Sequence, residues 1–255
     1  MEYTQRYISN ILTHFLGRDL ISEDMQFNLL KKILKEGWLT HPPHNPNISG
    51  NLQFKLEGDV DLDDMFSPQM ICFADIPLND LKLQMEKYSK FGVCFLKDFL
   101  IKKGANPVFY LAKNSEIITD CNVIFQDNKT IVQNMTSNRK IFFEDNIKNM
   151  FKYFERLHDI FLQKPEAFGI SNEFSKIHKI KMFLSFHIFG YMKAWNHDNN
   201  EEDPENYYFE REWRIIGNLK FQLGDVVRIV LPRKYAKLFR EEFKNYNGEI
   251  IFSDW

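Results

Sequence analysis

Closely spaced charges in the C-terminal part of the chain are the strongest candidates for chemistry, in the segment Glu210-Arg211-Glu212-Trp213-Arg214. Alternate side chains of a β-strand share a face, so Glu210, Glu212 and Arg214 are predicted to lie together. Two neighbouring carboxylates can drive their pKa values apart, which suits acid–base chemistry or stabilisation of a developing cation. The alternative interpretation is a structural Glu–Arg pair on a sheet face.

Other candidate side chains lie at the ends of predicted strands. His14 ends the first of them, where an imidazole can point into a cleft or form a hydrogen bond within the core. Asp75 follows the apolar segment CFA, where it can orient a base, bind a ligand or stabilise a turn. Tyr88 and Phe91 can form an aromatic wall beside a ligand, and core packing explains them as well.

The His and Cys residues do not form a recognisable metal-binding pattern. His41 and His44 are separated by two prolines, which favour an extended loop, and no third ligand is near. Cys72, Cys94 and Cys121 are far apart and form neither a zinc motif nor a disulfide framework. The sequence therefore predicts no metal site.

Composition narrows the class of protein that could carry these residues. The 255 residues are 44% apolar, enough to bury a sizeable core in one large domain or two small ones. Lys and Arg number 33 against 35 Asp and Glu, so no global positive field attracts nucleic acid or anionic lipid, although local nucleic-acid binding stays open. No apolar run approaches the roughly 20 residues of a membrane-spanning helix, and the N-terminal residues lack signal-peptide features. We expect a cytoplasmic protein without membrane contact.

Hydrophobic periodicity predicts an α+β fold with a mixed central sheet. A single domain is expected over residues 1–255, with residues 144–195 as a helical insertion or subdomain. Strands are expected at 11–17, 69–78, 91–96, 107–112, 207–217, 226–232 and 248–255. Helices are expected at 25–36, 79–88 and 233–246.

Several of these segments together resemble a known family. Six segments occur in the order found in the AbiGi-like family of bacterial abortive-infection proteins. They are THF, LKKILKEGWL, CFADIPLNDL, YSKFGVCF, GANPVFYL and YYFEREWRII. The resemblance spans nearly the whole chain and implies a role in defence against phage. It also implies a toxin or antitoxin protein partner, because the family is usually labelled the antitoxin-like partner of a nucleotidyltransferase toxin. A phage-derived trigger is a further expectation.

The order of the motifs is also similar to that of the ADP-ribosyltransferase superfamily. A His at the end of the first strand, an IL-x-x-G-x-L helix and a late Glu-x-Glu strand carry this resemblance. It implies a split β-sheet around NAD, in which His14 binds the nicotinamide ribose and Tyr88 or Phe91 stacks on nicotinamide. Glu212 would bind the ribose 2′-hydroxyl and stabilise an oxocarbenium-like transition state, and Glu210 would activate the acceptor.

Arg214 and Asp75 complete the set of residues expected to contact NAD. The middle strand departs from that superfamily, because Phe66-Ser67-Pro68 stands where a Ser-Thr-Ser motif is expected. An ADP-ribosyltransferase predicts that His14 and Glu212 share a cleft. A non-catalytic partner protein predicts instead that Arg214 is buried against Glu210 or Glu212.

Overall fold

The computed structural model divides into two compact units. It describes residues 9–41, 52–54, 66–77, 80–112, 116–117, 120–126, 129–136, 141–163, 171–196, 198–200, 203, 206 and 208–254. The first unit comprises Met1–Leu52, Pro68–Val108 and Glu201–Trp255, and the second comprises Gln53–Ser67 and Phe109–Asn200. The predicted helical segment 144–195 lies within the second unit, and its role as an insertion into a single domain stays a prediction.

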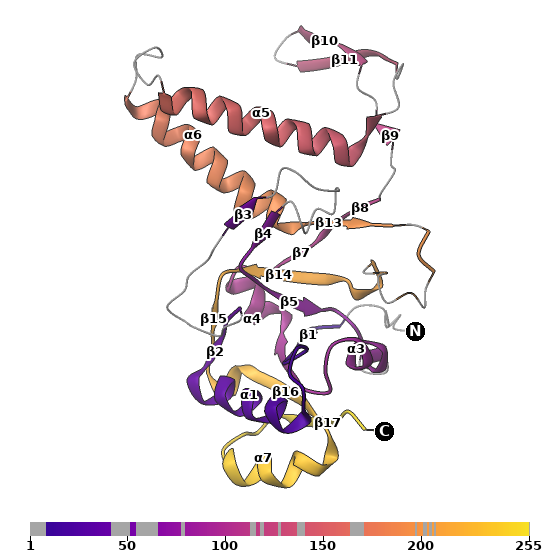
Figure 1. Ribbon diagram of the computed structural model, residues 1–255, viewed down its shortest axis with the longest axis vertical. Coiled ribbons are helices and arrows are strands. Elements are labelled where there is room, and N and C mark those ends of the chain that lie inside the picture. Colours follow the sequence, from indigo (N-terminus) through magenta and orange to yellow (C-terminus); the bar gives the residue numbers. More distant parts are fainter. Residues whose placement is uncertain are drawn as a thin grey trace. The chain divides into compact units, whose positions relative to one another are not determined.

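The first unit is built on a seven-stranded mixed sheet (Figure 1). Its strand order is β17-β16-β6-β1-β5-β14-β7. The strands are β1 (Ile11–Phe15), β5 (Met70–Ala74), β6 (Gly92–Leu96), β7 (Asn106–Pro107), β14 (Glu212–Ile216), β16 (Val226–Leu231) and β17 (Glu249–Phe252). Neighbouring strands run antiparallel except β16 and β17, which are parallel and joined through a helix. This confirms the predicted α+β class with a mixed sheet.

Four α-helices lie within the described residues of this unit, and the first shows why the sequence folds locally as it does. They are α1 (Glu23–Glu36), α3 (Leu81–Lys87), α4 (Lys97–Lys102) and α7 (Ala236–Glu242). The Ser22 hydroxyl accepts a hydrogen bond from the Met25 backbone N–H at 3.3 Å, which caps the start of α1. Gly37 ends the helix with φ 68°, a left-handed conformation that glycine adopts without steric cost.

The two faces of the sheet are buried by different elements. One face holds the main core, in which Phe73 and Phe95 of the strands pack with Phe27 of α1 and Phe239 of α7. The other face carries a smaller apolar cluster that includes Met85 of α3. Because side chains alternate along each strand, neighbouring residues of one strand point to opposite faces. This alternation decides which candidate residues lie on the same face and can contact one another.

The second unit contains a helix pair and several short strand pairs. The α-helices among its described residues are α5 (Phe143–Gln163) and α6 (Ser171–Phe183), and α6 continues into a π-helical turn at Leu184–Ile188. The strand β8 (Phe109–Ala112) pairs in parallel with β13 (Met192–Trp195). β10 (Asp120–Gln126) forms a hairpin with β11 (Lys129–Thr136), and β9 (Glu116–Ile117) pairs with β12 (Ile141–Phe142). Within the part of the chain that the structure describes, no helix has the length and apolar character needed to cross a membrane.

Two predicted strands differ from the observed ones. The segment 107–112 divides at Val108 into β7 and β8, which belong to different units. The segment 207–217 is a strand only from Glu212, because Tyr208–Glu210 forms a 3-10 turn and Arg211 has φ 44°. A left-handed residue cannot continue a β-strand. The prediction that Glu210 lies in this strand was therefore wrong.

Candidate functional site

Glu212 and Arg214 form a buried ion pair on β14. Their side chains lie two residues apart on one strand and therefore on the same face of the sheet. Arg214 Nε lies 2.6 Å from Glu212 Oε1, and the two residues are only 3% and 4% exposed. Exclusion of water strengthens the attraction between the charges and makes either charge costly without the other.

Glu210 reaches the same region from the turn that precedes β14. It is 4% exposed, and its Oε1 accepts hydrogen bonds from Lys87 Nζ and Tyr88 Oη, each at 2.7 Å. Lys87 is the last residue of α3 and Tyr88 caps that helix. The left-handed Arg211 links this turn to the strand. Glu210 therefore joins the C-terminal end of α3 to the start of β14.

Tyr88 lies within the electric field of both carboxylates. Burial raises the pKa of its phenol far above the usual value, and the charge of Glu210 and the hydrogen bond to it act in the same direction. The charges of Glu212 and Cys72 raise that pKa further. The structure thus brings Tyr88, Glu210 and Glu212 together, with the phenol kept protonated as a hydrogen-bond donor.

Asp75 belongs to a second charged contact at the end of β5. Its carboxylate accepts hydrogen bonds from the Ser9 backbone N–H at 3.0 Å and from Lys97 Nζ at 2.9 Å. The Lys97 ammonium also lies 5.1 Å from the ring centre of Trp213. The Asp75 backbone N–H donates to the Glu210 carbonyl at 3.3 Å. Asp75, itself 4% exposed, therefore ties the N-terminal segment and α4 to the sheet.

His14 and Phe91 are not brought into this group. Thr13 pairs with Ala74, and Ala74 pairs with Glu212, so these three side chains share one face of the sheet. His14 follows Thr13 on the strand and points to the opposite face, where its ring lies 5.7 Å from that of Phe73. Its Nδ1 lies 2.7 Å from the Cys72 carbonyl oxygen.

Phe91 belongs to the main core. It is 0% exposed, and its ring packs against those of Phe27 and Tyr235 at 6.3 and 5.4 Å. Of the two aromatic residues predicted to contact a ligand, only Tyr88 is partly exposed. Phe91 is therefore a packing residue.

The partners of the buried acids were missed by sequence reasoning. Lys87 and Glu210 are 123 residues apart in the chain, and Lys97 and Asp75 are 22 apart. No spacing rule relates such pairs, because only the tertiary fold brings them together. Within the described ranges, no group of three or more His, Cys, Asp or Glu residues is placed to hold a metal ion, and His44 lies outside those ranges.

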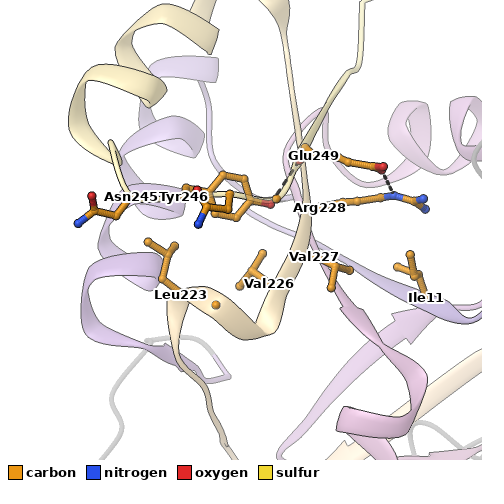
Figure 2. A pocket seen from close by; sticks show the side chains of 11 residues that line it. Ile11, Leu223, Val226, Val227, Arg228, Asn245, Tyr246 and Glu249 are labelled. Atoms are coloured by element: carbon orange, nitrogen blue, oxygen red, sulfur yellow. Dashed lines mark hydrogen bonds and ion pairs between the residues drawn. The ribbon is translucent and has the colours of Figure 1, made fainter.

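A cavity of about 540 Å³ lies elsewhere in the first unit (Figure 2). Its walls come from β1, β16, β17, the 3-10 turn Leu223–Asp225 before β16 and the segment that precedes β17. Arg228 Nε donates to Glu249 Oε2 at 2.5 Å, and Tyr246 Oη donates to the Glu249 carbonyl at 3.3 Å. The predicted site residues are not among those that line it. The cavity and the buried charged group are therefore separate features of this unit.

Comparison with known proteins places the chain among phage-resistance proteins. A family model described as "Putative abortive phage resistance protein AbiGi, antitoxin" matches residues 64–248, a range that includes the buried charged group but not His14. The chain is also similar to "Abortive phage resistance protein AbiGi" of Lactococcus lactis subsp. cremoris. The two are 27% identical over 203 residues, which cover 72% of this chain and 67% of that protein. No solved structure gives a significant match.

Proposed function

The chain belongs to the AbiGi family of abortive phage resistance proteins, and we propose that it acts as a non-catalytic antitoxin that binds and neutralises a toxin protein. The description of the family model as an antitoxin supports this proposal. Such a protein needs a stable fold and a binding surface, and it needs no reactive group held open to a substrate.

The buried Glu212–Arg214 pair is the observation that carries the proposal. A catalytic carboxylate must contact the reacting molecule, whereas Glu212 is 4% exposed and its Oε1 lies 2.6 Å from the Arg214 guanidinium. An ion pair of this kind stabilises a fixed arrangement of strands when both charges are present. The most enzyme-like segment of the sequence thus has a structural explanation.

Capture of the partner followed by a growth assay tests the proposal. The tagged chain is purified from its host before and after phage infection, and each captured protein is then expressed alone and together with the chain. We expect one captured protein to arrest growth alone and to be harmless when the chain is co-expressed. Absence of any captured protein with this behaviour would contradict the antitoxin function.

Transfer of ADP-ribose from NAD is the second candidate function. The convergence of Tyr88, Glu210 and Glu212 on one region favours it. The predicted NAD-binding residues do not fit NAD as a set, because His14 points to the other face and Phe91 is buried in the core. We therefore derive no catalytic step for it.

An assay with NAD labelled on the adenylate separates the two candidates. Wild type and Glu212→Gln are incubated with the label in lysates from infected and uninfected cells, so that a phage-derived trigger is present in one of them. Label transfer or nicotinamide release by the wild type, lost in a folded Glu212→Gln variant, would replace the antitoxin proposal with the enzymatic one. The antitoxin proposal expects neither reaction in either lysate.

A further inference from the structure

We propose that the exposed side of α5 is the surface with which this chain binds its toxin, and that the toxin receives it in an apolar groove with acidic residues along one rim. This inference rests on the proposed antitoxin function and names the surface that performs it. We refer to Tyr153, Leu157 and Ile160 as the α5 ridge.

The α5 ridge is apolar and exposed. Tyr153, Leu157 and Ile160 are 66%, 53% and 41% exposed. Their spacing of four and then three residues places them within an arc of roughly 60° on a helix of 3.6 residues per turn. Single exposed apolar residues are ordinary on protein surfaces, whereas a continuous row on one helix face marks a site of interaction.

The opposite side of α5 is already occupied within its own unit. Phe151 and His158 are 1% and 6% exposed, and the Phe151 ring lies 5.3 Å from that of Phe189. The His158 ring lies 5.9 Å from that of His178 on α6. Turning the ridge inward would expose Phe151 and break these contacts, so the ridge is a stable outer feature of the helix pair.

Two cations flank the ridge on one side. Lys152 and Arg156 directly precede two of the ridge residues, and both side chains are exposed. Neither forms an ion pair with another residue that the structure describes. Asp159 is the nearby acid on this side, and its carboxylate lies 3.9 Å from His158 Nδ1. A binding groove with carboxylates facing Lys152 and Arg156 would be complementary in charge and would speed association.

The same features favour a protein over other occupants. A helix with anchors at i, i+4 and i+7 fits the hydrophobic grooves that bind amphipathic helices. Nucleic acid and anionic membranes require a strongly basic face, and α5 is not basic overall. Its cationic residues are Lys148, Lys152 and Arg156, and its acidic residues are Glu144, Asp145, Glu155 and Asp159.

A pair of matched substitutions tests the α5 ridge. Leu157→Glu places a charge at its centre, and Leu238→Glu places the same charge on α7, where the leucine has the same exposed fraction of 53%. Binding to the toxin obtained by capture and growth assay is measured by calorimetry. We expect Leu157→Glu to weaken binding at least about tenfold and to abolish growth rescue, with Leu238→Glu within about twofold of wild type.

Further variants test the contribution of charge to toxin binding, and unfolding measurements control for loss of the fold. Arg156→Glu is expected to weaken binding more at low than at high ionic strength, because it reverses an attraction at the rim. Ile160→Ser serves as a second, milder ridge variant. Circular dichroism and thermal unfolding establish that each variant remains folded, as expected for exposed positions.

The outcomes separate this inference from the proposed function. A toxin that binds both ridge variants as tightly as wild type would overturn the α5 ridge while leaving the antitoxin function intact. Failure to capture any growth-inhibiting protein would overturn both. A change from dimer to monomer in Leu157→Glu, measured by light scattering with toxin binding unchanged, would assign the ridge to a second copy of this chain and overturn its role in toxin binding.

Discussion

Replacement of Arg214 by methionine should destabilise the fold severely, because it leaves the buried Glu212 carboxylate without its guanidinium. The two residues are 3% and 4% exposed, and Nε lies 2.6 Å from Oε1. Unit charges about 4 Å apart attract by about 4 kcal/mol at an effective dielectric constant of about 20. Measured losses on breaking buried pairs are about 3–5 kcal/mol. We expect a loss in this range, a large part of a typical total of about 5–15 kcal/mol.

Urea unfolding followed by circular dichroism measures the effect, and a second ion pair in the same sheet provides the control. Arg228 also contacts a glutamate, at 2.5 Å, but the Glu249 side chain is 63% exposed. Arg228→Met should therefore cost only about 0–1 kcal/mol. The double variant Glu212→Leu/Arg214→Met should recover most of the loss, because neither charge remains buried. A cost below about 1 kcal/mol for Arg214→Met would refute the argument that this pair is desolvated.

Three other results are expected. Gly37→Ala should lower the free energy of unfolding by more than about 1–2 kcal/mol, the cost of the left-handed backbone alone. The backbone has φ 68°, and the new Cβ would also lie 2.5 Å from the Phe221 carbonyl oxygen, so urea unfolding should show the larger loss. The pKa of Tyr88 is raised in the folded state, so its contribution to stability is complete below the tyrosine pKa of the unfolded chain, about 10, and falls above that pH. Above about pH 10, the free energy of unfolding of Tyr88→Phe should therefore fall less steeply with pH than that of wild type, as measured by urea unfolding across this pH range. Burial raises the pKa of the Cys94 thiol to about 11, so iodoacetamide should label exposed Cys72 in the native protein and spare Cys94, as read by peptide mass spectrometry.

The local parts of the fold were predictable from the sequence because their signals are local. The helix expected at 25–36 is α1, which ends before Gly37 as expected and begins two residues earlier than expected, after the Ser22 cap. Apolar segments near the strands β1, β5, β6 and β16 indicated the central sheet. The hairpin of β10 and β11 was not predicted, although its two strands contain the alternating and β-branched residues typical of strands.

The candidate site could be predicted from the sequence only in part. Its residue types indicated charge pairing, and the nearness of Glu212 and Arg214 follows from strand alternation alone. Strand alternation did not predict the left-handed backbone of Arg211 or the contact of Glu210 with Lys87. Both depend on how α3 meets the start of β14. The sequence also left the orientation of His14 open, which only the pairing of β1 with β5 decides.

The sequence by itself determined the fold class, most of the described α-helices, the strands of the seven-stranded sheet and the family, because periodicity, capping residues and motif order are properties of short segments. Only the tertiary structure decided which charges are buried and which apolar residues stay outside. Glu212 and Arg214 are enclosed, while Leu157 remains 53% exposed on a helix whose other side is packed. The physical reason is that burial depends on which distant segments cover a side chain, and local sequence carries no record of that choice.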